Sequence, residues 1–192
     1  MRIGTKSILF GVREFAGQGE GQGLTIFIGL DAGAKGAIVA LRSDGKMRIC
    51  RLDKTTEREQ WEFLNGIAEK ASWDNEPVYA VIEQIRPMPA FMGKGKGGDG
   101  EEQGTGMRGS IASMKIGQAY GFLRGLLIAS GIPFEEVSAQ KWQRAMGCLT
   151  GGDKRITRAK AQELFPNVKV IHVTADGILL SEYCHRIIMA RK

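Results

Sequence analysis

Three acidic residues far apart in the sequence each lie where a structural element is expected to begin or end. Asp31 follows one apolar run, Glu83 closes another, and Asp176 lies near the start of the last expected helix. A buried carboxylate costs free energy unless a cation or hydrogen bonds compensate its charge. Clustered carboxylates repel one another unless cations lie between them, and their oxygens suit Mg²⁺ or Mn²⁺. Two such ions, about 3.5–4 Å apart, would activate a water and stabilise the leaving oxygen of a phosphodiester.

Asp31 has a second interpretation. It opens a turn that contains Gly33, Lys35 and Gly36, and Asp often caps such turns with its own side chain. Nucleophilic catalysis by a Ser–His–Asp or Cys–His arrangement is not favoured, because the only histidines are His172 and His185.

The apolar pattern predicts the elements that must position the three acids. Two strands joined by a tight turn are expected within 26–41, a third antiparallel strand over 47–52, and a buried strand over 77–83. Thr56 and Glu59 form a capping box before an amphipathic helix. The order is that of a mixed α/β sheet with helices on its faces. The other expected elements are a helix over 110–130 capped by Ser110, a strand over 134–137, and helices after Ser138, over 158–165 and from a Thr174 cap.

Composition predicts one globular domain with a flexible N-terminal appendage. The chain has 192 residues, of which 43% are hydrophobic and 25% charged. Glycine alternates with polar residues up to Gly23, so residues 1–23 are expected to be the appendage and 24–192 the folded domain. No apolar run approaches the roughly 20 residues that span a bilayer. We therefore expect no membrane partner. Three widely spaced cysteines form no zinc or disulfide pattern, so we expect a cytoplasmic protein.

The net charge of +6 and the pI of about 9.3 are compatible with a polyanionic partner. The segment 86–109 is long and rich in glycine and lysine. We interpret it as a mobile loop that is ordered when a partner binds, with a merely disordered loop as the alternative.

Four stretches, taken together in their order and spacing, resemble RuvC-like Holliday junction resolvases, with the bacteriophage branch as the best match. The resemblance covers about residues 24–186. It rests on Ile28–Gly33 with Gly36-Ala37, on Val81–Glu83, on Lys115–Gln118 with Gly121, and on Ala175–Leu180.

The resemblance implies an RNase H-like fold, with a mixed five-stranded sheet of three antiparallel and then parallel strands, flanked by helices. It implies a homodimer that nicks paired strands of a four-way DNA junction with Mg²⁺, or Mn²⁺ as a substitute, in a bacterial or phage-infected cell. It makes Asp31, Glu83 and Asp176 the metal ligands.

The sequence departs from the family at one position. Such enzymes usually carry a further acid or histidine one helical turn from the last Asp, and here His172 is the candidate ligand or proton carrier; the alternative is an exposed loop histidine. Lys154, expected in a loop, matches the position of a catalytic or phosphate-neutralising lysine. Contacts with DNA phosphates, or solvated surface charges as the alternative, are expected at Lys94, Lys96, Arg108, Lys115, Arg155 and Arg158.

Other interpretations stay open. Gly117, Gly121 and Gly125 form a stripe that fits either a helix pair between subunits or packing on the chain's own sheet. The function could be that of an RNase H-like nuclease acting on other branched DNA or RNA, or of a non-catalytic DNA-binding module. The Asp31 turn also resembles the phosphate loop of sugar kinases and actin-like ATPases, but 192 residues cannot supply their two large lobes.

Overall fold

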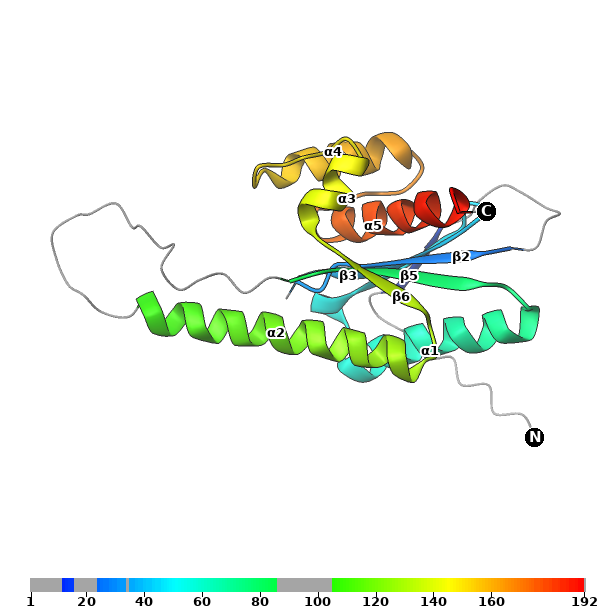
Figure 1. The fold of residues 1–192 in the computed structure, drawn as a ribbon, viewed down its shortest axis with the longest axis horizontal. Helices are drawn as coiled ribbons and strands as arrows, with labels where there is room; N and C mark the ends of the chain where they lie inside the picture. The colour runs from blue at the N-terminus through cyan, green and yellow to red at the C-terminus, as the bar shows by residue number, and fades with distance from the viewer. Residues whose placement is uncertain (1–11, 16–23, 34, 86–104, 192) are drawn as a thin grey trace, which may run out of the picture.

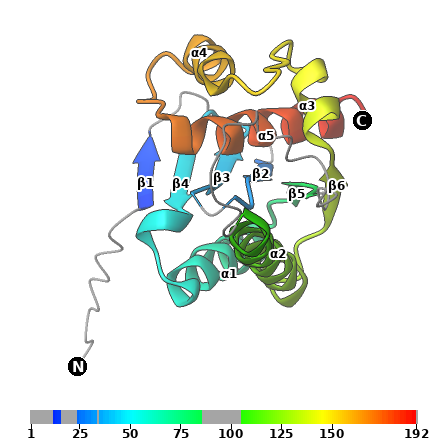
Figure 2. The ribbon, with the colours of Figure 1, turned by 90° about the vertical axis from the view of Figure 1, so that its left-hand side faces the viewer.

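A computed structural model describes residues 12–15, 24–33, 35–85 and 105–191 of the chain. These residues form a sheet between two layers of helices, as Figures 1 and 2 show. The strands are β1 (Val12–Phe15), β2 (Ile26–Leu30), β3 (Ala37–Arg42), β4 (Met47–Arg51), β5 (Val78–Glu83) and β6 (Phe134–Val137). The helices are the short 3₁₀ helix η1 (Leu52–Lys54), α1 (Glu57–Asp74), α2 (Thr105–Ala129), α3 (Ala139–Ala145), α4 (Lys154–Leu164) and α5 (His172–Met189).

The sheet is mixed, with strand order β1-β4-β3-β2-β5-β6. β2, β3 and β4 pair antiparallel, whereas β5 lies parallel to β2 and β6 lies parallel to β5. All five expected strands are present, and this arrangement confirms the predicted fold class. β1 adds a sixth strand, antiparallel to β4 at the edge, from the segment expected to be an appendage. The proposed domain boundary at residue 24 stays a prediction.

Helix α1 begins where expected, but α2, α4 and α5 begin earlier than expected, α4 at Lys154 and not at Arg158. Thr56 and Glu59 form the capping box of α1, and Asn75 ends it in the left-handed conformation with φ 54°. α2 begins at Thr105, so Ser110 lies inside the helix and the predicted cap is wrong. Nearby glycines had favoured a loop, but each glycine costs a helix only about 1 kcal/mol. α5 begins at His172, so Thr174 is not its cap.

The central strands are buried on both faces, because α5 covers one face of the sheet and α1 and α2 cover the other, as Figure 2 shows. Phe27 of β2 and Val81 of β5 belong to the core on the α5 side. Leu30 and Ile82 belong to the core on the other side. Side chains alternate along a strand, so positions 31 and 83 fall on the α5 side.

Two features bear on the expected compartment. The cysteines Cys50, Cys148 and Cys184 are all buried and free. Within the described ranges, no helix is both long enough and apolar enough to cross a membrane.

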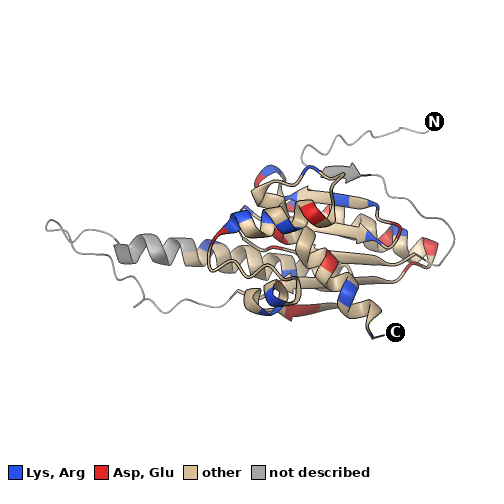
Figure 3. Cartoon of the chain, turned by 90° about the horizontal axis from the view of Figure 1, so that it is seen from above, with Lys and Arg blue, Asp and Glu red and all other residues tan. Residues whose placement is uncertain are grey.

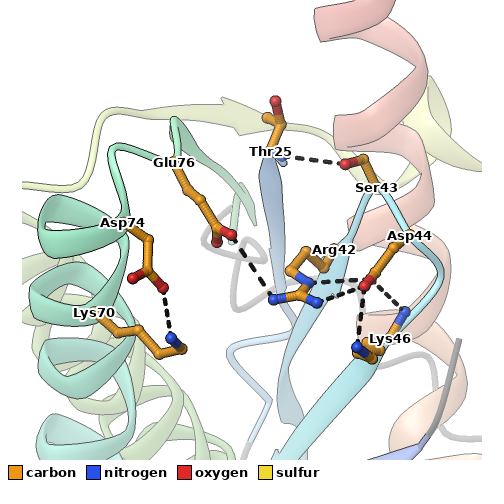
Figure 4. A network of polar contacts seen from close by, with 8 residues as sticks. All are labelled: Thr25, Arg42, Ser43, Asp44, Lys46, Lys70, Asp74 and Glu76. Atoms are coloured by element: carbon orange, nitrogen blue, oxygen red, sulfur yellow. Dashed lines mark hydrogen bonds and ion pairs between the residues drawn. The ribbon is translucent and has the colours of Figure 1, made fainter. Parts of the chain in front are cut away.

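A polar cluster holds the end of the sheet where β2 begins, as Figure 4 shows. Asp44, in the β3–β4 turn, accepts hydrogen bonds from Arg42 Nε at 3.1 Å and from the Lys46 backbone N–H at 3.0 Å. Arg42 Nη1 lies 3.8 Å from Oε1 of Glu76, just beyond α1. Because Arg42 is paired with Ile26, this cluster lies at the opposite end of β2 from Asp31. It therefore ties the hairpin to α1 without involving Asp31, Glu83 or Asp176.

Asp44 should stabilise the protein in a pH-dependent way. The hydrogen bond from Arg42 lowers the pKa of Asp44 to about 2. Because a lowered carboxyl pKa stabilises the fold above the unfolded pKa, this contribution of about 2 kcal/mol is lost as the pH falls from about 4 to 2. In urea unfolding, Asp44→Asn should lower the free energy of unfolding by this amount at pH 7 and flatten its fall in acid. Asp74→Asn, which removes an exposed ion pair with Lys70 on α1, is the control and should change either quantity little. Equal acid sensitivity in wild type and Asp44→Asn would contradict this assignment.

Candidate active site

Helix α5 crosses strand β2 at direct backbone contact. A Cβ atom added to Gly29 would lie 2.2 Å from Ser181 N and 2.4 Å from Gly177 O. A Cβ added to Gly177 would lie 3.0 Å from Ala37 O. Glycine inside a strand is typical of such close approach. The contact fixes the start of α5, and with it Asp176, over the end of β2.

Asp31 and Glu83 lie side by side because β2 and β5 run parallel in register. Leu30 is paired with Ile82, so the next residues, Asp31 just after β2 and Glu83 as the last residue of β5, lie at the same end of these two strands. The Asp31 turn closes through a hydrogen bond of 3.1 Å from the Asp31 N–H to Ala37 O. Asp31 Oδ1 also accepts the Gly33 N–H at 3.1 Å, so the turn-capping interpretation of Asp31 is correct.

The three predicted acids act on one another electrostatically. Burial raises the pKa of Asp31, and the charge of Asp176 raises it further. Burial raises the pKa of Glu83 to about 7, and Asp31 and Asp176 both add to that shift. Residues 31, 83 and 176 therefore form one acidic cluster, hereafter the carboxylate cluster, at the end of the sheet where α5 begins.

The two carboxylate oxygens of Asp176 have different surroundings. Oδ1 is buried and accepts no hydrogen bond from any described residue, although buried acceptors are usually paired. Its Oδ2 lies 3.9 Å from Nζ of Lys154, whose side chain is 69% exposed. Lys154 is the first residue of α4 and not a loop residue as predicted, because Asp153 caps the helix by accepting the Arg155 N–H at 2.9 Å. A pair of this length, with the lysine exposed, stabilises little and leaves the ammonium free to move.

Sequence reasoning missed a fourth contributor, Trp142 on α3. Its indole Nε1–H donates to Glu83 Oε2 at 2.7 Å, while its ring is fully buried. This bond favours the ionised form of Glu83 and opposes the effect of burial on its pKa. The available signal was general, since a buried tryptophan N–H needs an acceptor, but nothing in the sequence identified Glu83.

The chemical type of the donor atoms in the carboxylate cluster suits a hard divalent cation. The cluster offers carboxylate oxygens only, one of them buried without a partner, in a place where burial and mutual repulsion oppose negative charge. As the side chains stand, however, no group of three or more His, Cys, Asp or Glu residues in the described part of the chain is spaced to hold a metal ion. A cation would have to draw these carboxylates closer together.

His172 is exposed, whereas the three carboxylates of the cluster are partly buried. It is the exposed first residue of α5, four positions before Asp176, so the two lie one helical turn apart. Its charge contributes to lowering the pKa of Asp153, for which hydrogen bonds from Arg155 are the larger cause. Its role as a ligand or proton carrier stays a prediction.

The predicted DNA contacts divide into described and undescribed residues. Arg155 and Arg158 are exposed on α4, where Arg155 is paired with Asp153 at 2.8 Å. Lys115 is exposed on α2. Lys94 and Lys96 lie outside the described residues, as does the side chain of Arg108, a residue of α2. Figure 3 shows Lys and Arg mixed with Asp and Glu over this view, without a wholly basic face.

The glycine stripe of α2 faces away from the sheet. Gly117, Gly121 and Gly125 are exposed, and a Cβ added to any of them would meet nothing within 4 Å. Packing of this stripe on the chain's own sheet is therefore wrong. The alternative, a helix pair between subunits, stays a prediction.

Comparisons with known proteins gave structural neighbours only. No family model matches the chain, and no curated protein matches it. Among solved structures, it is similar to RuvC from T. thermophilus in complex with a Holliday junction substrate, at 13% identity and TM-score 0.46, covering 85% of this chain and 96% of that one. It is also similar to a further structure of Thermus thermophilus RuvC, at 12% identity and TM-score 0.46, with the same coverage.

Gly29→Ala should disturb the contact that positions Asp176. The new methyl group would overlap the backbone of α5, which cannot move aside as a side chain can. We expect a loss of about 1–3 kcal/mol in the free energy of unfolding, measured by urea denaturation. Gly66→Ala is the matched control, because a Cβ there meets nothing within 4 Å on α1, and it should stabilise by about 0.5–1 kcal/mol. Equal effects of the two changes would show that α5 does not depend on this contact.

Trp142→Phe should raise the pKa of Glu83 above its wild-type value of about 7, because the hydrogen bond that favours the carboxylate is lost. The measurement is a ¹³C NMR titration of the Glu83 carboxyl in the metal-free protein. Trp61→Phe, at an exposed position of α1, is the control and should leave that titration unchanged. A lower pKa of Glu83 in Trp142→Phe would contradict the assigned role of the indole.

Proposed function

We propose that the chain is a metal-dependent, structure-specific DNA endonuclease that resolves four-way junctions by paired symmetric nicks. The observation that carries the proposal is the carboxylate cluster, in which Asp31, Glu83 and Asp176 come from three distant parts of the sequence to one end of the sheet. The unpartnered Asp176 Oδ1 supports a cation as the missing partner. The resemblance of the sequence motifs to RuvC-like resolvases, bacteriophage branch included, supplies the substrate class of the proposal.

In this proposal the three carboxylates hold Mg²⁺, or Mn²⁺ in its place. Bound divalent ions supply a nucleophilic water at neutral pH and stabilise charge on the leaving oxygen. The hydrogen bond from Trp142 favours the ionised form of Glu83, and Gly33 fixes Asp31 through its N–H. Lys154, mobile and 3.9 Å from Asp176, neutralises charge on the phosphate.

The remaining parts of the proposal concern DNA and assembly. His172 serves as a further ligand or proton carrier one turn before Asp176. Lys115, Arg155 and Arg158, exposed on α2 and α4, contact phosphates, together with Lys94, Lys96 and Arg108. A homodimer, through the exposed glycine stripe of α2, would place two clusters about a two-fold axis that matches the symmetry of a four-way junction.

The proposal is tested by incubating the purified chain with a synthetic four-way junction and Mg²⁺, beside matched linear duplex and RNA substrates. We expect paired nicks in the junction alone, at symmetric positions. Asp31→Asn and Glu83→Gln should each lower the rate at least about 100-fold, because a metal ion stabilises the transition state by several kcal/mol. Loss of activity in His172→Gln would assign that residue to the site.

Glu163→Gln is the matched control, since Glu163 is an exposed acid on α4 whose partner is Lys160. It should cut at the wild-type rate. Nicking that survives both cluster changes would contradict the assignment of the site. Cutting of duplex or RNA as fast as the junction would favour a less selective nuclease, and junction binding without cutting at any metal concentration would favour a DNA-binding module.

A further inference from the structure

A cavity of about 350 Å³ lies on the other side of the Asp31 turn from the carboxylate cluster. It is formed where the turn, the start of α1 and the middle of α2 meet. This volume is at the lower end of the range typical of small-ligand sites. The lining residues that matter here are Gly33, Glu57, Gln60, Ala119, Phe122 and Leu123.

The side chains of the cavity present acceptors and apolar surface. Gln60 is buried, and its Nε2 donates to the backbone oxygen of Thr55 at 3.2 Å, which leaves Oε1 as an acceptor that no described residue uses. Glu57 adds a carboxylate at the mouth, where it is exposed. Phe122 and Leu123 form an apolar wall. Such a site suits a flat, neutral ligand with hydrogen-bond donors.

Charge excludes an anion as the occupant. None of the described residues that line the cavity is a lysine or arginine. Glu57 and Glu59 occupy the first turn of α1, where their charges offset the attraction of the helix N-terminus for anions. A phosphate group would therefore be repelled, whereas the edge of a nucleobase with an amino group would find acceptors.

The cavity is joined to the carboxylate cluster by one residue. Gly33 lines the cavity, and its N–H donates to Asp31 Oδ1 at 3.1 Å. An occupant would therefore contact the same turn that holds Asp31.

We propose that this cavity binds an unstacked nucleobase bearing an exocyclic amino group, from the nucleotide next to the phosphate held at the carboxylate cluster. The inference rests on the proposed nuclease function and adds a base preference to it. Base donors meet Gln60 Oε1 and Glu57, and the ring packs against Phe122 and Leu123. Occupancy would favour cleavage sites with cytosine, adenine or guanine at that position over thymine, which lacks the amino group.

Binding is tested first without DNA or metal. ¹⁵N-labelled full-length protein is titrated with each of the four deoxynucleosides, and backbone signals are followed by NMR. We expect the Gly33 and Gln60 signals to move, with Kd values for deoxycytidine and deoxyadenosine at least about threefold below that for thymidine, since their exocyclic amino groups donate to the acceptors of the cavity and thymidine has no such group. Shifts confined to other residues, or equal affinity for thymidine, would overturn the inference.

A filled cavity provides the matched test. Ala119→Phe places a ring in the cavity and should abolish the shift at Gly33, whereas Ala129→Phe, at an exposed position of the same helix, should not. Unchanged nucleoside binding in Ala119→Phe would overturn the inference. If Ala119→Phe fails to fold, the smaller change Ala119→Leu is used, and the wild-type titration still decides.

Cleavage then separates the inference from the proposed function. Four-way junctions that differ in the base beside the cut are compared, and Ala119→Phe should flatten the preference of wild type while still nicking. Cleavage without any base preference or nucleoside binding would overturn the cavity's role and leave the nuclease intact. Nucleoside binding by a chain that cuts no junction would overturn the nuclease and keep the cavity as a base-binding site.

Discussion

The constraint on which the candidate site depends is the contact between the backbone of α5 and strand β2. Because Gly29 and Gly177 have no Cβ atom, the helix can approach the strand closely. A methyl group at either position would lie too near the backbone of the other element. Asp176 is adjacent to one of these glycines, and Asp31 lies two residues beyond the other. The contact thus determines whether a helix residue and a strand-end residue, 145 positions apart in the chain, act in one electrostatic environment.

The carboxylate cluster and the ion pairs around Asp44 lie at opposite ends of the sheet. The carboxylate cluster brings together buried charges of one sign, which destabilises the fold when they are ionised. At the other end Asp44 is compensated by Arg42 and Lys46. With the pKa of Glu83 near 7, a cation at the cluster competes with a proton, so its binding should strengthen as the pH rises. The ion pairs around Asp44 join opposite charges, so they bring no such repulsion near neutral pH.

Patterns that repeat along the chain were predictable, and contacts between distant residues were less so. Apolar runs identified five strands, and the Thr56–Glu59 capping box identified the start of α1. The three acids could be proposed as a group because strand ends are readable and parallel strands end at one edge. The bond from Trp142 to Glu83 joins residues 59 positions apart, with no local pattern at either. Helix starts were misplaced at Ser110 and Thr174 because residues that often cap helices also occur inside them.

Asp31 has two separable duties, and this separation has a practical use. One oxygen of its side chain accepts the Gly33 N–H and shapes the turn, whereas its negative charge belongs to the cluster. An asparagine keeps an acceptor oxygen for the first duty and lacks the charge for the second. If the proposed nuclease function holds, such a chain would keep its native conformation while leaving nucleic acid uncut, which is the property required of a substrate trap for crystallography or electron microscopy.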